Sequence, residues 1–190
     1  MTSRESLAAL LRERSVKFGD FVLSSGRRSP YYIDARRTTM SAQGQRLIGE
    51  LGLGAIREAG WAPAGVGGLT MGADPVAYAI ARASADAPPL VQAFSVRKAA
   101  KEHGTRQTIE GNFAPGDPVV VVEDVLTTGA SALQAIDAIR GAGGSILGVL
   151  VVVDREQGGR AAVEKSGIEV VALTTTHGIL EIQQGLKADG

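Results

Sequence analysis

Two nearly continuous apolar runs do most to limit how this chain can fold. They are VVVV at residues 119–122 and SILGVLVVVD at 145–154, and the segment between them, SALQAIDAIRGAG, has helical spacing and ends in glycine. Strands without polar alternation are buried on both faces, which requires helices on each side of the sheet. A strand–helix–strand unit of this kind predicts an α/β protein with an open, mostly parallel sheet flanked by helices.

The rest of the chain repeats this alternation. Periodic apolar residues predict helices, and short apolar runs between turn signals predict strands. The expected helices span residues 3–15, 41–59, 74–84, 131–143, 159–167 and 178–187. The expected strands span residues 64–69, 90–96, 119–122, 145–154 and 168–175. The residues expected at helix ends are Ser3 or Ser6 as the first cap, Gly60 after the second helix, and Asp74 with Pro75 at the start of the third.

Length and composition narrow the class of protein. At 190 residues, the whole of 1–190 is expected to form one domain. Twenty acidic residues balance twenty basic ones, so no net charge directs the chain to nucleic acid or to a membrane, and neither is an expected partner. The sequence has no cysteine, which rules out disulfides and fits a reducing compartment. Without a signal peptide or an apolar run of ~18–20 residues, the expected location is cytoplasmic.

Two segments depart from the alternation. Residues 18–38 carry turn signals and short β-like runs before any helical crossover, which predicts a small accessory layer near the N-terminus. About 1–38 would then form an N-terminal helix and hood, and about 40–175 the core. Residues 97–111, RKAAKEHGTRQTIEG, are polar and basic and lie between two strands. A connection of this length is usually a functional lid, a flexible insertion, or both.

Acidic, small and hydroxylated residues follow the first apolar run, in VVVVEDVLTTGAS. Ligands of open α/β sheets bind beyond the carboxyl ends of the strands, where residues 123–131 are expected to lie. Small residues let backbone N–H groups converge on an anion, and the start of the next helix adds partial positive charge. Residues 127–131 therefore predict a phosphate site, although neither GxxxxGK[ST] nor a complete GxGxxG is present.

The paired carboxylates of Glu123 and Asp124 would repel a bare phosphate. They fit a phosphate attached to a sugar, whose vicinal hydroxyls can donate charge-assisted hydrogen bonds to both acids. The stretch therefore predicts a phosphorylated polyol, with its phosphate in the loop and its diol on the acids. The alternative is an acid pair that serves only as solvated charge and helix cap, and the coincidence of acids, small residues, hydroxyls and a helix start favours the ligand.

These residues resemble a known family. VVVVEDVLTTGAS resembles the phosphoribosyl diphosphate signature of type I phosphoribosyltransferases. Three further segments resemble the orotate phosphoribosyltransferases within that superfamily. Their N-terminal motif is similar to FVLSSGRRSPYYIDARR at 21–37. Their mobile catalytic loop is similar to RKAAKEHG at 97–104 together with IEG at 109–111, and the segment whose arginine meets orotate is similar to VDRE at 153–156. The matches cover about residues 18–160 in the family's order.

The resemblance implies a reaction. The phosphoribosyl group of 5-phospho-α-D-ribose 1-diphosphate would be transferred to orotate, giving orotidine 5′-monophosphate and pyrophosphate in the biosynthesis of UMP. It also implies a Mg²⁺ cofactor that is bound mainly through substrate oxygens and not by protein ligands. The working unit would be a homodimer in which the loop 97–111 reaches the neighbouring active site. A fused decarboxylase, present in some relatives, is not expected in this chain.

The resemblance also implies which residues form the site. The residues expected to bind the diphosphate substrate are Arg97, Lys98, Lys101, His103, Glu123, Asp124, Val125, Leu126, Thr127, Thr128, Gly129, Ala130 and Ser131. Those expected to act in catalysis are Lys98, Lys101, His103 and Asp124. Those expected to bind orotate are Tyr32, Ile33, Thr127 and Arg155. The chemistry of Arg155 agrees, because a planar guanidinium fork suits the carboxylate of orotate.

The chain departs from the family pattern at two positions. Ser24 and Met71 stand where many relatives carry lysine. Compensating positive charge would have to come from arginines of the N-terminal segment, namely Arg27, Arg28 or Arg36, each of which could equally be a surface charge. The glycine-rich run 65–72 could present backbone N–H groups to pyrophosphate, or it could serve close packing of strand on helix.

Other interpretations stay open from the sequence alone. A purine or other base phosphoribosyltransferase would share the phosphate loop and the acids, but it would give no reason for Arg155 or the basic loop. A non-catalytic regulator that senses the same ligand and binds nucleic acid would need a basic face, against which the balanced charge argues. The basic loop could also be a solvated helical face, and His177 is expected to be structural.

Overall fold

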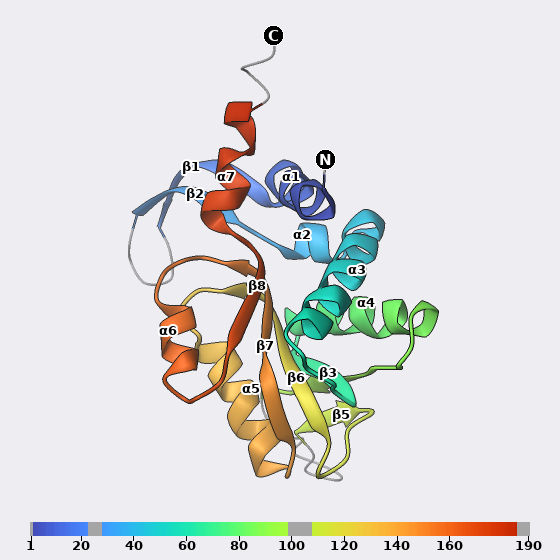
Figure 1. The fold of residues 1–190 in the computed structure, drawn as a ribbon. Coiled ribbons are helices and arrows are strands. Elements are labelled where there is room, and N and C mark those ends of the chain that lie inside the picture. Colours follow the sequence, from blue (N-terminus) through green and yellow to red (C-terminus); the bar gives the residue numbers. More distant parts are fainter. Residues whose placement is uncertain (1, 23–27, 99–107, 186–190) are drawn as a thin grey trace.

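The computed structural model describes residues 2–22, 28–98 and 108–185, with side chains in the last helix up to residue 181. Strands and helices alternate along it, as Figure 1 shows. The strands are β1 (Val16–Val22), β2 (Arg28–Ile33), β3 (Gly65–Leu69), β4 (Gln92–Val96), β5 (Ile109–Gly111), β6 (Pro118–Leu126), β7 (Ser145–Asp154) and β8 (Val170–Thr175). The helices are α1 (Ser3–Ser15), α2 (Arg36–Thr39), α3 (Ala42–Glu58), α4 (Ala73–Asp86), α5 (Ala130–Gly141), α6 (Gly159–Glu164) and α7 (Thr176–Gly185).

The described strands form one large and one small sheet. The large sheet has six strands in the order β5-β4-β3-β6-β7-β8, and β1 pairs only with β2. Neighbours in the large sheet run parallel, apart from the antiparallel pair β4–β5. The predicted open, mostly parallel α/β fold is therefore confirmed. Within the predicted loop 97–111, however, residues 109–111 form the edge strand β5, because Val96 and Ile109 pair in register.

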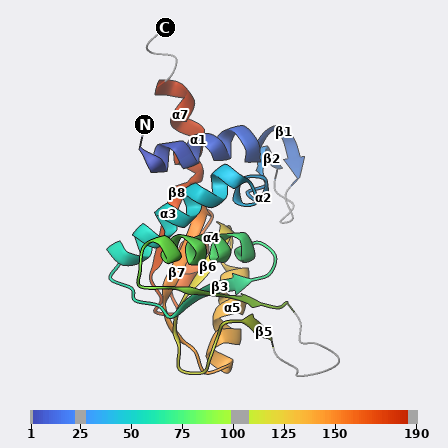
Figure 2. The same cartoon turned by 90° about the vertical axis from the view of Figure 1, so that its right-hand side faces the viewer.

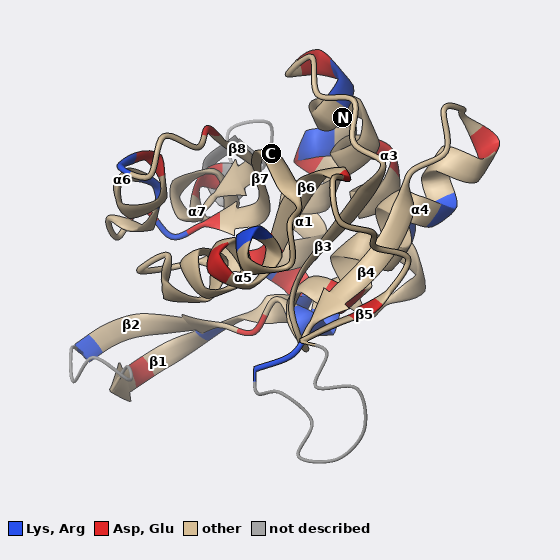
Figure 3. Ribbon diagram, turned by 90° about the horizontal axis from the view of Figure 1, so that it is seen from below, with Lys and Arg blue, Asp and Glu red and all other residues tan. Residues whose placement is uncertain are grey.

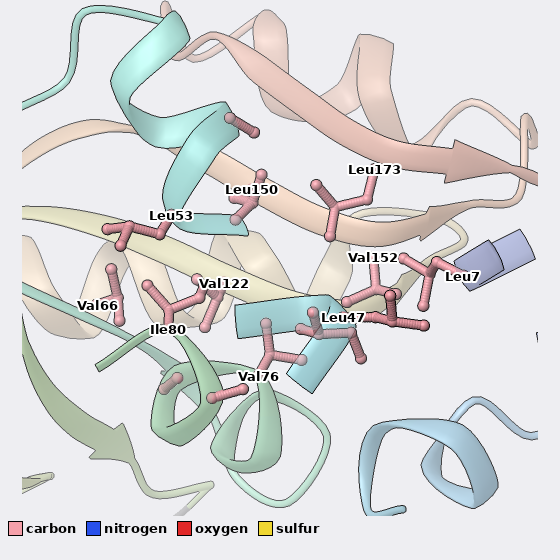
Figure 4. Close-up of a cluster of buried hydrophobic side chains, with 14 of the residues drawn as sticks. Leu7, Leu47, Leu53, Val66, Val76, Ile80, Val122, Leu150, Val152 and Leu173 are labelled. Atoms are coloured by element: carbon pink, nitrogen blue, oxygen red, sulfur yellow. The ribbon is translucent and has the colours of Figure 1, made fainter. Parts of the chain in front are cut away.

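The sheet is buried on both faces, as the apolar runs predict. In β6 and β7, Val122 and Leu150 point to the α3 and α4 side, where Figure 4 shows them with Ile80 and other apolar side chains. Val121 and Val149 point to the opposite side and pack against α5 and α6. Figure 1 shows the two layers of helices on either side of the sheet. Alternate strand residues therefore supply two cores, and each buried Val or Leu side chain contributes roughly 1.5–3 kcal/mol.

The ends of the first two long helices follow local chemistry. Thr2, and not Ser3 or Ser6, caps α1: its hydroxyl accepts from the Glu5 N–H at 3.2 Å, and the Glu5 carboxylate accepts from the Thr2 N–H at 2.7 Å. This reciprocal pair satisfies two helix-end donors at once, which a cap at Ser3 would not do. Helix α3 ends at Glu58, and Gly60 follows its C-cap as predicted, with φ +72° and hydrogen bonds from the Gly60 and Trp61 N–H groups back to the last turn.

The start of α4 differs from the prediction. Its N-cap is Gly72, with no side-chain hydrogen bond to the helix end, so the expected cap Asp74 lies inside the first turn. The Asp74 carboxylate accepts instead from the Thr70 hydroxyl at 2.6 Å and from the Ser95 hydroxyl at 2.7 Å. Both hydroxyls come from the carboxyl ends of neighbouring strands, which local sequence cannot reveal. Asp74 therefore fixes the loop between β3 and α4.

The predicted accessory layer is a hairpin with helices beside it. Strands β1 and β2 pair antiparallel, from Val16 opposite Ile33 to Val22 opposite Arg28. Figures 1 and 2 show this hairpin at the same end of the molecule as α1, α2 and α7. The C-terminal helix α7 is tied to α1 by a hydrogen bond from Arg12 to the Leu180 carbonyl at 3.1 Å. None of the helices among the described residues is long and apolar enough to cross a membrane.

Candidate active site

The acid pair lies in a cavity at the carboxyl end of β6. Strand β6 was expected to end at residue 122 but continues to Leu126, so Glu123 and Asp124 belong to the strand and not to the loop after it. The cavity has a volume of about 310 Å³ and is bounded by the β3–α4 loop, the start of α5 and two basic side chains. Its lining residues are Arg36, Leu69, Thr70, Met71, Gly72, Ala73, Lys98, Glu123, Asp124 and Ser131. We call it the acid-pair cavity.

Both carboxyl groups of the pair lie in an environment that disfavours their charge. Burial, with the neighbouring Asp124 carboxylate adding to it, raises the pKa of Glu123 to about 7, and the Ser131 hydroxyl opposes this in part. Burial also raises the pKa of Asp124, against hydrogen bonds from backbone N–H groups and the positive charge of Arg36. Within the described residues, Glu123 Oε2 is buried without a hydrogen-bond partner. The pair is therefore short of donors, which a ligand with hydroxyl groups could supply.

The predicted phosphate loop has an open helix end. Gly129 is the N-cap of α5 with φ +84° and gives that helix no side-chain cap, and the Ala130 N–H makes only a long contact to the Thr128 hydroxyl at 3.5 Å, so this helix end suits an anion. The Thr127 carbonyl lies 2.7 Å from where a Cβ on Gly159 would be, so α6 packs directly against this loop. The side chains of Val125 and Leu126 pack into the two cores, which leaves only their backbone groups for a ligand.

Arg155 lies beside this loop at the end of β7. Leu126 and Asp154 are paired residues of the sheet, and the Arg155 N–H donates to the Leu126 carbonyl at 2.9 Å. The Arg155 side chain is only 7% exposed, and its Cζ lies 5.4 Å from the centre of the Tyr31 ring. In the described part of the chain, its Nε and Nη2 have no hydrogen-bond partner. A permanently charged group in this state requires an anion, and a carboxylate matches its geometry.

The turn that carries Arg155 is fixed by its neighbours. Buried Asp154 accepts from the Glu156 N–H at 2.8 Å and from Arg160 Nε at 3.1 Å. Glu156 has φ +56°, and its carboxylate accepts from the N–H of His177 at 3.1 Å. The His177 ring in turn lies 2.9 Å from the Glu181 carboxylate on the same helix. His177 therefore takes part in joining α7 to the end of β7 and does not line the acid-pair cavity.

The basic segment is described only at its two ends. The Lys98 side chain lines the acid-pair cavity, and its carbonyl accepts from the Gln134 amide on α5 at 3.3 Å. Arg97 pairs with Glu110 across the β4–β5 stem at 3.4 Å, and its predicted contact to the diphosphate substrate stays a prediction. Lys101 and His103 lie outside the described residues, and their predicted roles remain predictions.

The glycine-rich run serves close packing, one of its two suggested uses, and its N–H contact to pyrophosphate stays a prediction. A Cβ on Gly67 or Gly68 would lie 2.3 Å from the Phe94 carbonyl or 2.1 Å from the Val122 carbonyl, so these glycines allow close packing. A Cβ on Gly72 would lie 2.5 Å from Asp124 Oδ1, so Gly72 lets the β3–α4 loop approach the acid pair. The exposed Met71 lines the cavity at the position where lysine is common in the family.

The N-terminal motif contributes to the site in a way that sequence reasoning only partly found. Tyr32 is exposed and Ile33 is buried, whereas the ring that meets Arg155 belongs to Tyr31. Alternation along β2 places Tyr31 and Ile33 on one face, which was the available signal. Of the arginines considered as compensation, Arg28 pairs with Asp20 at 2.5 Å and Arg36 lines the acid-pair cavity. Ser24 and Arg27 lie outside the described residues.

The fold and this site are those of a phosphoribosyltransferase, and comparison with known proteins bears out this class. Residues 41–177 match the phosphoribosyl transferase domain family. The chain is 47% identical over 176 residues to an orotate phosphoribosyltransferase of Aquifex aeolicus, covering 91% of this chain and 95% of that relative. It belongs to the orotate phosphoribosyltransferase family, as the resemblance of its motifs predicted.

Solved structures agree with this assignment. The crystal structure of Mycobacterium tuberculosis orotate phosphoribosyltransferase in complex with Fe(III) dicitrate has a TM-score of 0.84 and 43% identity, covering 94% of this chain and 99% of that chain. The same mycobacterial protein in complex with 5-phospho-α-D-ribosyl 1-diphosphate has a TM-score of 0.80 and 39% identity, with coverage of 94% and 99%. The chain is thus similar to these proteins over almost its whole length.

Proposed function

We propose that this protein transfers the phosphoribosyl group of 5-phospho-α-D-ribose 1-diphosphate to orotate, forming orotidine 5′-monophosphate and pyrophosphate in UMP biosynthesis. The observation that carries the proposal is the buried Arg155 guanidinium, whose Nε and Nη2 lack partners among the described residues, beside a phosphate loop and an acid pair. An acid pair and a phosphate loop alone would fit any phosphoribosyl acceptor. A buried cation that needs a planar anion selects an acceptor with a carboxylate.

The geometry supports one arrangement of the two substrates. The 5-phosphate would accept from the N–H groups and hydroxyls of residues 127–131, and the ribose diol would donate to Glu123 and Asp124. Orotate would place its carboxylate on Arg155, with Thr127 on the neighbouring strand end and the backbone at Tyr32 and Ile33 reading the pyrimidine edge. Because β6 and β7 are adjacent, the two substrates would meet between these strand ends.

The reaction exchanges one bond to the ribose C1. The acceptor nitrogen of orotate forms the new C–N bond, its proton passes to the departing group or to water, and the C–O bond to pyrophosphate breaks with its electron pair. Positive charge develops on the ribose, so the protein's work is positioning and neutralising the leaving group. Lys98, Lys101 and His103 would supply charge to the pyrophosphate, and Asp124 would hold the ribose as its charge develops.

The acid-pair cavity also fits a substrate that carries Mg²⁺. Among the described residues no group of three acidic or histidine side chains could hold a metal ion by itself, so the ion would be held mainly by substrate oxygens. Glu123 Oε2, which has no partner within that part of the chain, is suited to a hydroxyl or water bound to the ion. When bound, Mg²⁺ would act as a Lewis acid that neutralises charge on the pyrophosphate.

We further propose a homodimer in which residues 97–111 of one subunit reach the active site of the other. Exposed apolar side chains support an association surface: Met40 is 52%, Met71 59% and Tyr78 52% exposed. Gln45 ties their segments together, because its amide donates to the carbonyls of Thr39 and Pro75. The proposed location is the cytoplasm, since a chain without cysteine does not depend on an oxidising compartment.

The first expected result is nucleotide formation with orotate and with no other common base. Purified protein would be incubated with phosphoribosyl diphosphate, Mg²⁺ and one of orotate, uracil, adenine, hypoxanthine or guanine. Uracil is the matched control, because it is orotate without the carboxylate that Arg155 would bind. Equal turnover of uracil and orotate would remove the role of Arg155. Saturable binding of phosphoribosyl diphosphate without turnover of any base would instead favour a regulator. Such a regulator would need a basic face to bind nucleic acid, whereas Figure 3 shows acidic and basic residues interspersed on α3, α4, α5 and α6.

The second expected result concerns the basic loop. The double variant Lys98→Ala/Lys101→Ala should lose at least ~100-fold in turnover with orotate binding unchanged, because two charge-assisted contacts to the leaving group are removed. Mixing this variant with Asp124→Asn, each inactive alone, should restore part of the activity, since mixed dimers contain one site with both parts intact. Turnover within a few-fold of the wild type would refute the leaving-group role. A mixture that stays inactive would refute the exchange of loops between subunits.

A further inference from the structure

Arg36 is a cationic side chain of the acid-pair cavity that has no assigned contact in the proposed arrangement of substrates. Among the residues that the structure describes, the positive charges lining this cavity are those of Arg36 and Lys98. Lys98 borders the basic loop, whereas Arg36 comes from α2 in the N-terminal layer. The two cations therefore reach the cavity from separate parts of the fold.

Arg36 is oriented by a neighbouring carboxylate. Its Nε donates to Asp34 Oδ1 at 2.9 Å, and the Asp34 side chain is 27% exposed against 49% for Arg36. Within the described residues neither terminal nitrogen of Arg36 donates a hydrogen bond. An arginine held at Nε keeps its two outer NH₂ groups in a fixed plane, and these are the groups that bind phosphate oxygens.

The backbone that carries Arg36 is also held in place. The Asp34 N–H donates to the Ser15 carbonyl at 2.9 Å, and the buried hydroxyls of Ser15 and Thr38 are 2.7 Å apart. On the other side of Thr38, a Cβ on Gly44 would lie only 1.9 Å from the Thr38 carbonyl oxygen, so α3 packs directly onto this turn. Anchors to both α1 and α3 thus fix the position of Arg36 before any ligand binds.

The charges around Arg36 leave it available to an anion. The groups that interact with it electrostatically are Asp34, Asp124 and the Tyr32 hydroxyl. Of these, Asp34 forms the ion pair, and no direct ion pair joins Arg36 to Asp124 in the described part of the chain. Asp124 has its own proposed donor in the ribose diol. Arg36 is thus close enough to the acid pair to act on the same ligand without being neutralised by it.

The shape of the proposed substrate says which of its groups would meet Arg36. Phosphoribosyl diphosphate carries its single phosphate on C5 and its diphosphate on C1, at opposite ends of the ribose. With the 5-phosphate at residues 127–131 and the diol on the acids, the diphosphate would point away from the loop, toward the side of the cavity lined by Arg36, Lys98 and Met71. Among the described residues of this cavity the other cation is Lys98, and a group with several negative charges can accept hydrogen bonds from both.

We propose that Arg36 binds the diphosphate group of the substrate, and that Asp34 is the positioning residue that holds it. The inference rests on the proposed function and adds a specific phosphate contact to it. It also explains how the cavity functions with Met71 in place of a lysine.

The test measures the binding of inorganic pyrophosphate with Mg²⁺ to the full chain by titration calorimetry. Arg36→Met should weaken this binding ~10- to 100-fold, as expected for the loss of a charge-assisted contact. Arg36→Lys should recover part of the affinity, and Asp34→Asn should lose less than Arg36→Met. Arg37→Met is the matched control, because Arg37 is exposed on the same turn but does not line the cavity, and it should bind like the wild type.

The kinetic pattern separates this inference from its alternatives. Arg36→Met should impair the use of phosphoribosyl diphosphate and leave the KM for orotate unchanged. An affinity of Arg36→Met for pyrophosphate within two-fold of the wild type would overturn the inference. If the pH profile of activity shifted while pyrophosphate binding stayed unchanged, Arg36 would act only on Asp124, and the inference would also be wrong. The protein could also bind pyrophosphate in a way that depends on Arg36 and yet transfer phosphoribose to no base. That result would refute the proposed reaction and support the contact of Arg36 with the diphosphate.

Discussion

Replacing Arg155 with methionine should strongly impair the use of orotate without destabilising the free protein. The guanidinium is 7% exposed, and within the described residues its Nε and Nη2 have no partner. Before substrate binds, the protein therefore bears the cost of a buried charge that, in the described part of the chain, the ring of Tyr31 partly compensates. Methionine has a similar length and no charge, so it removes that cost together with the contact to orotate.

The two effects can be measured separately. Loss of a buried charged contact to a ligand typically costs about 2–5 kcal/mol, which corresponds to roughly 30- to several-thousand-fold in kcat/KM for orotate. Thermal unfolding without ligand should show an unchanged or higher Tm, because replacing a buried charged group by an apolar one is often neutral or stabilising by about 1–4 kcal/mol. Binding of phosphoribosyl diphosphate should remain, since the acid pair and the loop 127–131 are untouched.

Arg160 provides the matched control at the same end of β7. Its Nε donates to the buried carboxylate of Asp154 at 3.1 Å, and its Nη1 donates to the Val170 carbonyl at 2.5 Å. Arg160→Met should therefore lower the Tm, because Asp154 is left with an unpaired buried charge, while the KM for orotate changes little. A fall in Tm for Arg155→Met with normal use of orotate would show that the two arginines are alike and that Arg155 is structural.

The strands and helix ends around the site could be predicted from the sequence because each depends on neighbouring residues in the chain. An apolar run such as 145–154 can only be a strand buried on both faces, and Gly60 ends α3 with φ +72° as its sequence position indicates. The acids and the small residues of 123–131 are contiguous, so their meeting at one strand end follows from the strand alone. Residues 97–111 were expected to be a connection, and β5 within them was missed because its pairing partner β4 lies before that segment in sequence.

What the sequence could not predict depends on contacts between distant segments. The Asp74 carboxylate could have capped α4, but hydroxyls on the ends of two strands lie closer to it. Tyr31 approaches Arg155 only because the β1–β2 hairpin lies over the carboxyl ends of the core strands. The assignment of Arg36 to the acid-pair cavity likewise depends on anchors to α1 and α3, and these are tertiary contacts without a periodic signal.

The second large effect is a pH dependence that comes from Glu123. Burial and the charge of Asp124 raise the pKa of Glu123 from its ordinary 4.5 to about 7 in the folded protein. The folded state therefore binds more protons than the unfolded state between these values, and the contribution of Glu123 to stability falls as pH rises from 4.5 through 7. Above about pH 7 the full cost of the buried charge is present, on the order of 3 kcal/mol for a shift of this size.

Glu123→Gln isolates this contribution. The amide keeps the shape of the side chain and does not titrate, so the variant should match the wild type near pH 4.5 and become more stable than it by pH 8. The free energy of unfolding would be measured by denaturant titration at intervals from pH 4.5 to 8.5. Asp137→Asn is a control for general charge effects, because Asp137 is exposed on α5. A constant difference between wild type and Glu123→Gln at every pH would contradict a raised pKa.

Substrate binding should depend on Glu123 with the opposite pH trend, because affinity should rise over the pH range in which stability falls. A ribose diol donates its hydrogen bonds to the ionised carboxylate, so binding lowers the pKa of Glu123 and releases a proton at pH values below about 7. Affinity for phosphoribosyl diphosphate should rise from pH 5 to 7 and then level off, less steeply in Glu123→Gln. Phosphate groups also titrate near pH 6, so the diagnostic quantity is the difference in protons released between wild type and variant, measured by calorimetry in two buffers. Equal proton release by both proteins would place the diol away from Glu123, and the acid pair would then serve the fold and not the ligand.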